Sequence, residues 1–196
     1  MSHEEPAIVN ALVELCKQLN VRCLVQVGAE DGYEAEEIRK ATGCRAVCFD
    51  ADPHCGPASF GLEWYQVMIG ATDSMADFYV HAARGLSSPI ARADGMEEKH
   101  ELFQRRLDTF CAERGIVPDA LIIDTEGTTL DVLEGTGSLI NGVRLVYAEC
   151  QTQSIRPGMR LLSEVDACLT NRGFTRRAGP PEYDAGSQGN YCWTRP

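Results

Sequence analysis

The sequence contains no apolar run long enough to cross a membrane. Although 44% of the 196 residues are hydrophobic, polar residues interrupt every apolar segment well before the roughly 20 consecutive positions that a membrane helix needs. Residues 1–6 carry glutamates where a secretory signal would place positive charge ahead of an apolar stretch. We therefore expect a cytoplasmic protein in which residues 1–196 form a single domain.

Paired cysteines are also missing. The chain has nine cysteines, an odd number, and no two of them form a Cys-x-x-Cys pair. This spacing argues against both a disulfide framework and a zinc site. We expect reduced thiols that are mostly buried.

Basic residues are scarce, with 18 Lys and Arg against 29 Asp and Glu and a formal net charge of −11. Nucleic acids and anionic membranes are held largely by clustered Lys and Arg. The basic pairs at residues 105–106 and 176–177 are isolated in the sequence. We therefore expect neither nucleic acid nor a membrane as a partner, and predict a small-molecule or biosynthetic-intermediate acceptor instead.

Short apolar segments alternate with segments of helical periodicity through most of the chain. Strands are predicted at residues 23–27, 46–49, 64–69, 120–123 and 143–148, and helices at residues 1–20, 33–41, 128–136 and 158–172. This alternation predicts an α/β fold, with a doubly wound, mostly parallel sheet that carries helices on both faces. Residues 21–196 would form this core, after the N-terminal helix.

The C-terminal part departs from the alternation. Residues 174–177 and 191–194 are two predicted strands without a helix between them, so they predict an antiparallel C-terminal hairpin and bring the sheet to seven strands. Their connection, residues 178–190, is longer than the usual hairpin loop. If the first of these strands runs parallel to the central ones, the loop emerges at the carboxyl edge of the sheet. It is then either a substrate loop or a mobile connection.

A nucleoside site is predicted where the first two strands end. The first strand runs into a glycine turn and then a helix, an arrangement that brings backbone close to a bound nucleotide. Asp50 closes the second strand, where a carboxylate can accept hydrogen bonds from both hydroxyl groups of a ribose. The residues of the two segments that we expect to contact the cofactor are Gly28, Ala29, Glu30, Asp31, Gly32, Asp50, Ala51 and Asp52.

The acidic turn favours S-adenosylmethionine over a dinucleotide. Glu30 stands two positions after Gly28 and Tyr33 five positions after it, so the Gly-x-Gly-x-x-Gly pattern is absent. Acidic side chains in the turn would repel a pyrophosphate, whereas S-adenosylmethionine brings a sulfonium and an ammonium. Its carboxylate could be received by N–H groups at the start of the following helix. An NAD(P)-dependent oxidoreductase is the weaker alternative.

Three carboxylates are candidates for the chemistry. Asp124 and Glu126 follow the fourth strand and Glu149 closes the fifth, so they could meet beside the cofactor. For a hydroxyl acceptor, one of them could be a general base with a raised pKa. Alternatively, the group could hold a divalent ion such as Mg²⁺, or Glu126 and Glu149 could only brace the loops by hydrogen bonds.

The chain resembles the FkbM-type methyltransferases, a family of class I S-adenosylmethionine-dependent enzymes that mostly methylate hydroxyl groups. The resemblance covers most of the chain from about residue 23 to residue 194, and its most specific part is Ile123-Asp124-Thr125-Glu126-Gly127, which looks like the family's Asp-x-Glu-Gly signature. The other matching segments are residues 25–32, 49–53, 69–71, 77–80, 85–88 and 106–110. The resemblance implies an O-methyltransferase and adds Ile69 and Gly70 to the cofactor site.

Two residues depart from the family's pattern. Gln26 stands where the family usually has an acidic residue, and Ile122 stands where it usually has a lysine. A catalytically silent binding module or partner subunit is therefore the alternative to an active enzyme. Because the short N-terminal region leaves little material for a lid, a homodimer in which a second subunit completes the pocket is a further hypothesis.

Overall fold

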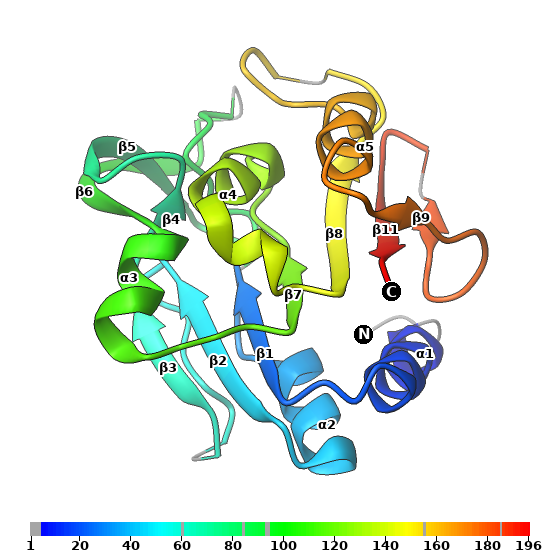
Figure 1. The fold of residues 1–196 in the computed structure, drawn as a ribbon. Helices are drawn as coiled ribbons and strands as arrows, with labels where there is room; N and C mark the ends of the chain where they lie inside the picture. Colours follow the sequence, from blue (N-terminus) through cyan, green and yellow to red (C-terminus); the bar gives the residue numbers. More distant parts are fainter. Residues whose placement is uncertain (1–4, 60, 84, 93–94, 155, 185) are drawn as a thin grey trace.

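The computed structural model describes residues 5–59, 61–83, 85–92, 95–154, 156–184 and 186–196. A central sheet runs through the molecule (Figure 1), and the described residues give it eight strands in the order β10-β11-β8-β7-β1-β2-β3, with β9 paired to β11. The strands are β1 Cys23–Val27, β2 Arg45–Asp50, β3 Glu63–Gln66, β7 Ala120–Ile123, β8 Leu145–Gln151, β9 Thr175–Arg176, β10 Tyr183–Asp184 and β11 Gln188–Thr194.

Five neighbouring strands of this sheet, in the order β8-β7-β1-β2-β3, pair in parallel, and β11 runs antiparallel to β8. Both short strands, β9 and β10, are antiparallel to β11. Arg176 of β9 lies opposite Trp193, as expected for a hairpin between residues 174–177 and 191–194. The predicted doubly wound, mostly parallel sheet with antiparallel C-terminal strands is confirmed.

Helices cover both faces of the sheet (Figure 1). On one face lie α1 Glu5–Gln18 and α2 Tyr33–Thr42; on the other lie α3 Leu107–Arg114, α4 Thr129–Gly135, the 3₁₀ helix η1 Gly137–Asn141 and α5 Leu162–Thr170. Because side chains alternate along a strand, Leu24 packs against α1 and α2 whereas Val25 packs in the core on the other face. This double burial explains why the central strands are continuously apolar.

Two predicted elements end earlier or begin later than expected. The strand predicted at residues 64–69 leaves the sheet after Gln66, and Ile69–Gly70 forms β4 in a different sheet. The helix predicted at residues 158–172 begins only at Leu162, because Leu161 is extended and is the N-cap residue. The N–H of Leu161 donates a hydrogen bond to Glu164 Oε2 at 2.9 Å. Apolar spacing alone could not locate these boundaries.

A second sheet has the order β4-β6-β5 and contains the strand that the sequence analysis missed. β5 Ser74–His81 and β6 Glu97–Arg106 form a long antiparallel hairpin. Apart from Leu102 and Phe103, β6 consists of charged or polar residues, so it carried no apolar signal. The inner face of the hairpin contributes Phe78 and Val80 to a small cluster with Met68.

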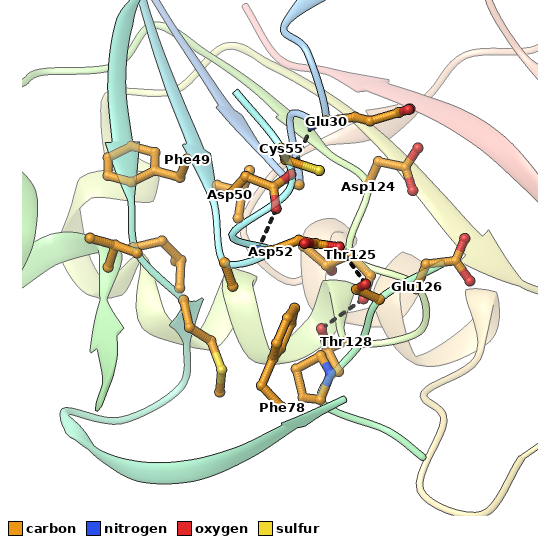
Figure 2. A pocket seen from close by; sticks show the side chains of 18 of the residues that line it. Glu30, Phe49, Asp50, Asp52, Cys55, Phe78, Asp124, Thr125, Glu126 and Thr128 are labelled. Carbon is orange, nitrogen blue, oxygen red and sulfur yellow. Dashed lines mark hydrogen bonds between the residues drawn. The ribbon is translucent and has the colours of Figure 1, made fainter. Parts of the chain in front are cut away.

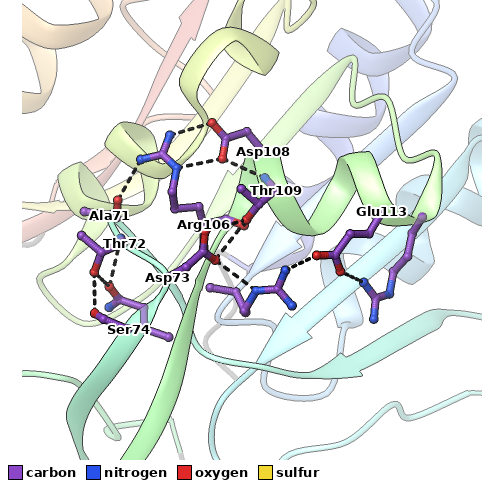
Figure 3. Close-up of polar contacts among 11 residues, drawn as sticks. Ala71, Thr72, Asp73, Ser74, Arg106, Asp108, Thr109 and Glu113 are labelled. Carbon is purple, nitrogen blue, oxygen red and sulfur yellow. Dashed lines mark hydrogen bonds and ion pairs between the residues drawn. The ribbon is translucent and has the colours of Figure 1, made fainter.

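A polar network fixes the base of this hairpin (Figure 3). Asp73 accepts hydrogen bonds from Arg105 Nε, from Arg106 N and from Thr109 Oγ1, each at 3.0 Å. The Arg106 backbone bond is the main reason why the pKa of Asp73 is lowered. Arg106 in turn donates to both carboxylate oxygens of Asp108, at 2.9 and 2.6 Å. The network holds the end of β6, and with it β4, against α3.

All nine cysteines are free, and all except Cys168 are buried. Burial raises the pKa of Cys16 and of Cys48 to about 12, so these thiols stay protonated near neutral pH. Among the described residues, every helix is too short or too polar to span a bilayer.

Candidate active site

The loops that follow β1 and β7 touch at the carboxyl edge of the sheet. Gly28 adopts a φ of 73°, and a Cβ atom placed on it would lie 1.6 Å from the carbonyl oxygen of Asp124. Only glycine permits both this conformation and this approach. The glycine turn is therefore fixed directly against the loop that carries the predicted catalytic residues.

Asp50, at the end of β2, organises the glycine turn. Its Oδ2 accepts a hydrogen bond from Glu30 N and its Oδ1 accepts one from Asp52 N, both at 2.8 Å (Figure 2). Burial raises the pKa of Asp50, while the two backbone donors oppose that rise. Each carboxylate oxygen can still accept a second hydrogen bond, so Asp50 can hold the turn and a ligand hydroxyl together.

Asp52 connects this segment to the loop at residues 85–92. Its carboxylate is buried and accepts hydrogen bonds from Ser87 Oγ at 2.5 Å and from His54 N at 2.8 Å. Ser87 Oγ also accepts a hydrogen bond from His81 N at 2.9 Å. The loop is thus fastened over the end of β2.

These segments line a first cavity, with about 640 Å³ of open space. Its apolar wall is formed by Phe49, Val67, Met68 and Phe78. Six predicted cofactor residues line it, namely Gly28, Glu30, Asp50, Ala51, Asp52 and Ile69. Thr125 also lines it, and its Oγ1 is buried with no hydrogen-bond partner among the described residues. A ligand with apolar and hydroxyl-bearing parts would match this lining.

A second cavity, with about 1570 Å³ of open space, lies between α1, α2 and the C-terminal hairpin. It shares Gly28, Glu30 and Asp124 with the first cavity, so the two meet at the glycine turn. The predicted cofactor residues Ala29 and Asp31 line only this second cavity.

The two remaining predicted cofactor residues, Gly32 and Gly70, are not among the described lining residues of either cavity. A Cβ atom on Gly32 would lie 2.5 Å from Leu62 Cδ1. A Cβ atom on Gly70 would lie 2.2 Å from Gln104 Nε2. Both glycines allow close packing next to the site.

The structure brings the three predicted catalytic carboxylates together. One carboxylate oxygen from each of Asp124, Glu126 and Glu149 lies within 4.8 Å of the others. The Asp124 side chain opens into the cleft. Desolvation by the surrounding protein raises the pKa of Asp124 well above its ordinary value, and repulsion from Glu149 and Glu126 adds to the rise. Burial and the charge of Glu126 raise the pKa of Glu149 to about 7.

Glu126 differs from its two neighbours because it is paired with cations. Its Oε2 accepts hydrogen bonds from Arg92 Nη1 and Arg156 Nη2, both at 3.3 Å, and its carbonyl oxygen accepts one from Ser88 Oγ at 3.0 Å. The sequence analysis missed both arginines, which are 34 and 30 residues away and belong to no motif. Glu126 therefore braces loops, and Asp124 and Glu149 are the two carboxylates of the group with a raised pKa.

Amide side chains orient Glu149. Gln151 Nε2 donates to Oε1 at 2.9 Å and Gln188 Nε2 donates to Oε2 at 3.3 Å. Gln188 belongs to the long connection at residues 178–190, and Tyr183 and Asn190 from the same segment line the second cavity. This connection does lie at the carboxyl edge of the sheet, beside the candidate catalytic residues.

The family model for the methyltransferase FkbM domain matches residues 26–175. The chain belongs to the FkbM family of S-adenosylmethionine-dependent methyltransferases. The match includes the glycine turn, Asp50, Asp124 and Glu149, the residues around which this FkbM-family site is arranged. No curated protein sequence matches the chain significantly.

Solved methyltransferases are similar to this FkbM-family chain at low sequence identity. Magnesium protoporphyrin IX methyltransferase from Synechocystis PCC 6803, solved with bound SAM, is 10% identical with a TM-score of 0.53, over 99% of this chain and 80% of that chain. An O-methyltransferase family protein from Burkholderia thailandensis is 9% identical with a TM-score of 0.48, over 97% of this chain and 59% of that chain. The first likeness supports the class I methyltransferase fold.

The residues present fit the cofactor that the family uses. Asp50 offers acceptors for ribose hydroxyl groups, and the apolar wall suits an adenine ring. Thr125 Oγ1, which has no hydrogen-bond partner among the described residues, offers a further polar contact. Carboxylates around the glycine turn suit a sulfonium and an ammonium.

Side chains of the protein engage two N–H groups at the start of α2. Of the first three N–H groups of α2, Tyr33 N donates to Asp31 Oδ1 at 3.0 Å and Ala35 N donates to Gln26 Oε1 at 3.2 Å. These two groups already have acceptors in the protein, and the contact between the helix start and the cofactor's carboxylate stays a prediction for the remaining N–H groups. Acidic and amide residues next to a helix start commonly cap it in this way.

Proposed function

We propose that the chain transfers a methyl group from S-adenosylmethionine to a hydroxyl oxygen of a small-molecule acceptor. The observation that carries this proposal is the position of Asp124, which lines both cavities and lies beside Glu149. A carboxylate at the junction of a donor cavity and an acceptor cavity can take the proton that a hydroxyl group must lose on methylation.

The first cavity would hold the nucleoside part of the cofactor. Asp50 would accept hydrogen bonds from the ribose, and Phe49, Met68 and Phe78 would enclose the adenine. When bound, S-adenosylmethionine supplies an electrophilic methyl group next to a positive sulfur. The acidic residues near Gly28 would favour that positive charge, because carboxylates attract a cation strongly at short range in a poorly solvated site.

Asp124 would act as the general base, with Glu149 sharing its proton. Two neighbouring carboxylates in an enclosed site hold a proton more tightly than either would alone, so their titration belongs to the pair. A raised pKa matches a base that must accept a proton near neutral pH. Gln151 and Gln188 would keep Glu149 oriented, and the arginine-bound Glu126 would keep the loop in place.

The second cavity would receive the acceptor. Its described lining contains four carboxylates, Glu30, Asp31, Glu34 and Asp124, together with Tyr33, Tyr147 and Tyr183, and no Lys, Arg or His. Such a lining disfavours anionic acceptors. The proposed acceptor is therefore a neutral or cationic small molecule or biosynthetic intermediate, and nucleic acid is disfavoured for the same reason.

Paired acceptors test the reaction. A panel of hydroxylated small molecules and their O-methylated counterparts would be incubated with the protein and S-adenosylmethionine, and release of S-adenosylhomocysteine measured. The proposal predicts turnover with a hydroxylated member and none with its methylated counterpart. Tight S-adenosylhomocysteine binding with no turnover across the panel would favour the silent binding module instead.

Metal dependence is the weaker mechanism for this site. Glu126 is held by two guanidinium groups, which leaves Asp124 and Glu149 as the carboxylates available to a cation. We expect dialysis against EDTA to leave turnover unchanged, and a loss that Mg²⁺ restores would favour the metal mechanism. The cytoplasmic location and the homodimer stay predictions, to be tested by fractionation and by light scattering.

A further inference from the structure

A buried amide holds a carboxylate of α2 at the wall of the second cavity. Gln26 is only 2% exposed, and its Nε2 donates to Glu34 Oε2 at 3.0 Å while its Oε1 accepts a hydrogen bond from Ala35 N at 3.2 Å. Gln26 and Glu34 line this cavity together with Gly28 and Asp124. The amide therefore fixes where the negative charge of Glu34 lies.

From this arrangement we propose that Glu34, positioned by Gln26, binds the α-ammonium group of the methyl donor. The proposal rests on the proposed function, because it concerns the amino-acid part of S-adenosylmethionine. If the nucleoside occupies the first cavity, the rest of the cofactor leaves it at the shared boundary of Gly28, Glu30 and Asp124. Beyond that boundary lies the wall formed by Gln26 and Glu34.

The other carboxylates of the second cavity differ from Glu34 in position or in proposed role. Asp31 accepts a hydrogen bond from the first N–H of α2. Glu30 extends toward the opposite loop, where a Cβ atom on Gly85 would lie 3.5 Å from its Oε2. Asp124 belongs to the proposed proton-sharing pair. Glu34 is the carboxylate that lies next to β1 on the side of the second cavity.

The pairing also explains why an amide occupies position 26. A carboxylate there would face Glu34 at hydrogen-bond distance, and two like charges at such a distance repel strongly in a poorly solvated site. Gln26 can still accept the hydrogen bond from Ala35 N while donating to Glu34. The negative charge is thus carried by the helix instead of the strand.

Two ligands that differ only in the amino-acid part provide the test. S-adenosylhomocysteine carries the α-ammonium and carboxylate, whereas 5′-methylthioadenosine keeps the nucleoside and the sulfur but lacks both. We expect Glu34→Gln to weaken S-adenosylhomocysteine binding by roughly ten- to a hundredfold, as for loss of a charge-assisted hydrogen bond, and to leave 5′-methylthioadenosine binding within about threefold. Isothermal titration calorimetry measures both.

Two further variants separate charge from folding. Glu37→Gln removes a negative charge from the same helix, where Glu37 pairs with Lys40 at 2.9 Å, and should change neither affinity. The double variant Gln26→Glu with Glu34→Gln returns the carboxylate to the strand with an amide partner, and should restore S-adenosylhomocysteine binding to within about threefold of the parent.

Several results would overturn the inference. They are an equal loss for both ligands, no loss for either, and a double variant that stays weak. A parent protein that binds neither ligand would contradict the proposed function itself. If Glu34 instead serves an amine on the acceptor, both ligands will bind Glu34→Gln as they bind the parent.

Discussion

Two pairs of carboxylates lie at the same edge of the sheet, and their surroundings differ sharply. Asp50 and Asp52 accept hydrogen bonds from backbone N–H groups and from a serine hydroxyl. Glu149 accepts hydrogen bonds from two amide side chains, and it faces the charge of Asp124. The first pair is held by hydrogen-bond donors of the protein, whereas the second pair is proposed to share a proton.

This difference assigns a task to each pair. Donors that bind a carboxylate hold the loops that it connects. Repulsion and enclosure make a carboxylate readier to bind a proton. We therefore expect changes in the first pair to alter cofactor binding, and changes in the second pair to alter turnover and its dependence on pH.

The largest expected effect comes from Asp124→Asn. This change removes the proposed base while keeping the shape of the side chain, so turnover should fall by roughly a hundredfold or more. Binding of S-adenosylhomocysteine should stay within about threefold of the parent. Steady-state kinetics and calorimetry measure the two quantities, and an unchanged turnover would remove Asp124 from the mechanism.

Asp50→Asn should show the opposite pattern. An amide in this place loses one of the acceptors that hold Glu30 N and Asp52 N, and offers one fewer to a ribose. We expect S-adenosylhomocysteine affinity to fall by roughly tenfold, as for one hydrogen bond to a charged group, with turnover at saturating cofactor nearly unchanged. Asp77→Asn on the exposed hairpin is the matched control.

Glu149→Gln should move the pH dependence of turnover. In the parent, kcat/KM should rise with pH as the pair loses its shared proton, and the pKa of Glu149 is raised to about 7. Removing that charge lowers the pKa of Asp124, since Glu149 is its strongest charged neighbour. The midpoint of the profile should therefore shift to lower pH by about one unit. A shift to higher pH would contradict the shared proton.

The smallest expected effect is on stability. Because the folded-state pKa of Glu149 is raised from 4.5 to about 7, its contribution to stability is fully present below pH 4.5 and is lost as the pH rises to about 7. Glutamine does not titrate, so the free energy of unfolding of Glu149→Gln should rise relative to that of the parent by on the order of 1–3 kcal/mol as the pH is raised from about 5 to about 8. Thermal melts at the two pH values measure it, with Glu37→Gln as a flat control.

The parts of the molecule that could be predicted share one property, a local apolar signal. Cys23–Val27 and Ala120–Ile123 are continuous apolar strands, and the carboxylates at strand ends could be expected to meet because parallel strands end at one edge. β6 could not be predicted, since it gains its place from pairing with β5 and from the Asp73 network.

The partners of the site residues were beyond the sequence for a related reason. Arg92 and Arg156 reach Glu126 from distant loops, and this pairing separates a bracing carboxylate from the two that are proposed to share a proton. Gln26 was visible as a departure from the family's pattern, but its hydrogen bond to Glu34 depends on how α2 lies against β1. Residue types and spacing alone do not give such relative positions.

The central claim is that the cleft between Gly28, Asp50 and Asp124 binds S-adenosylmethionine. A crystal structure of the protein soaked with S-adenosylhomocysteine tests it most directly. We expect the ribose against Asp50, the adenine beside Phe78 and the sulfur next to Asp124. Density for the nucleoside elsewhere on the protein, with the first cavity empty in the same crystal, would contradict the account.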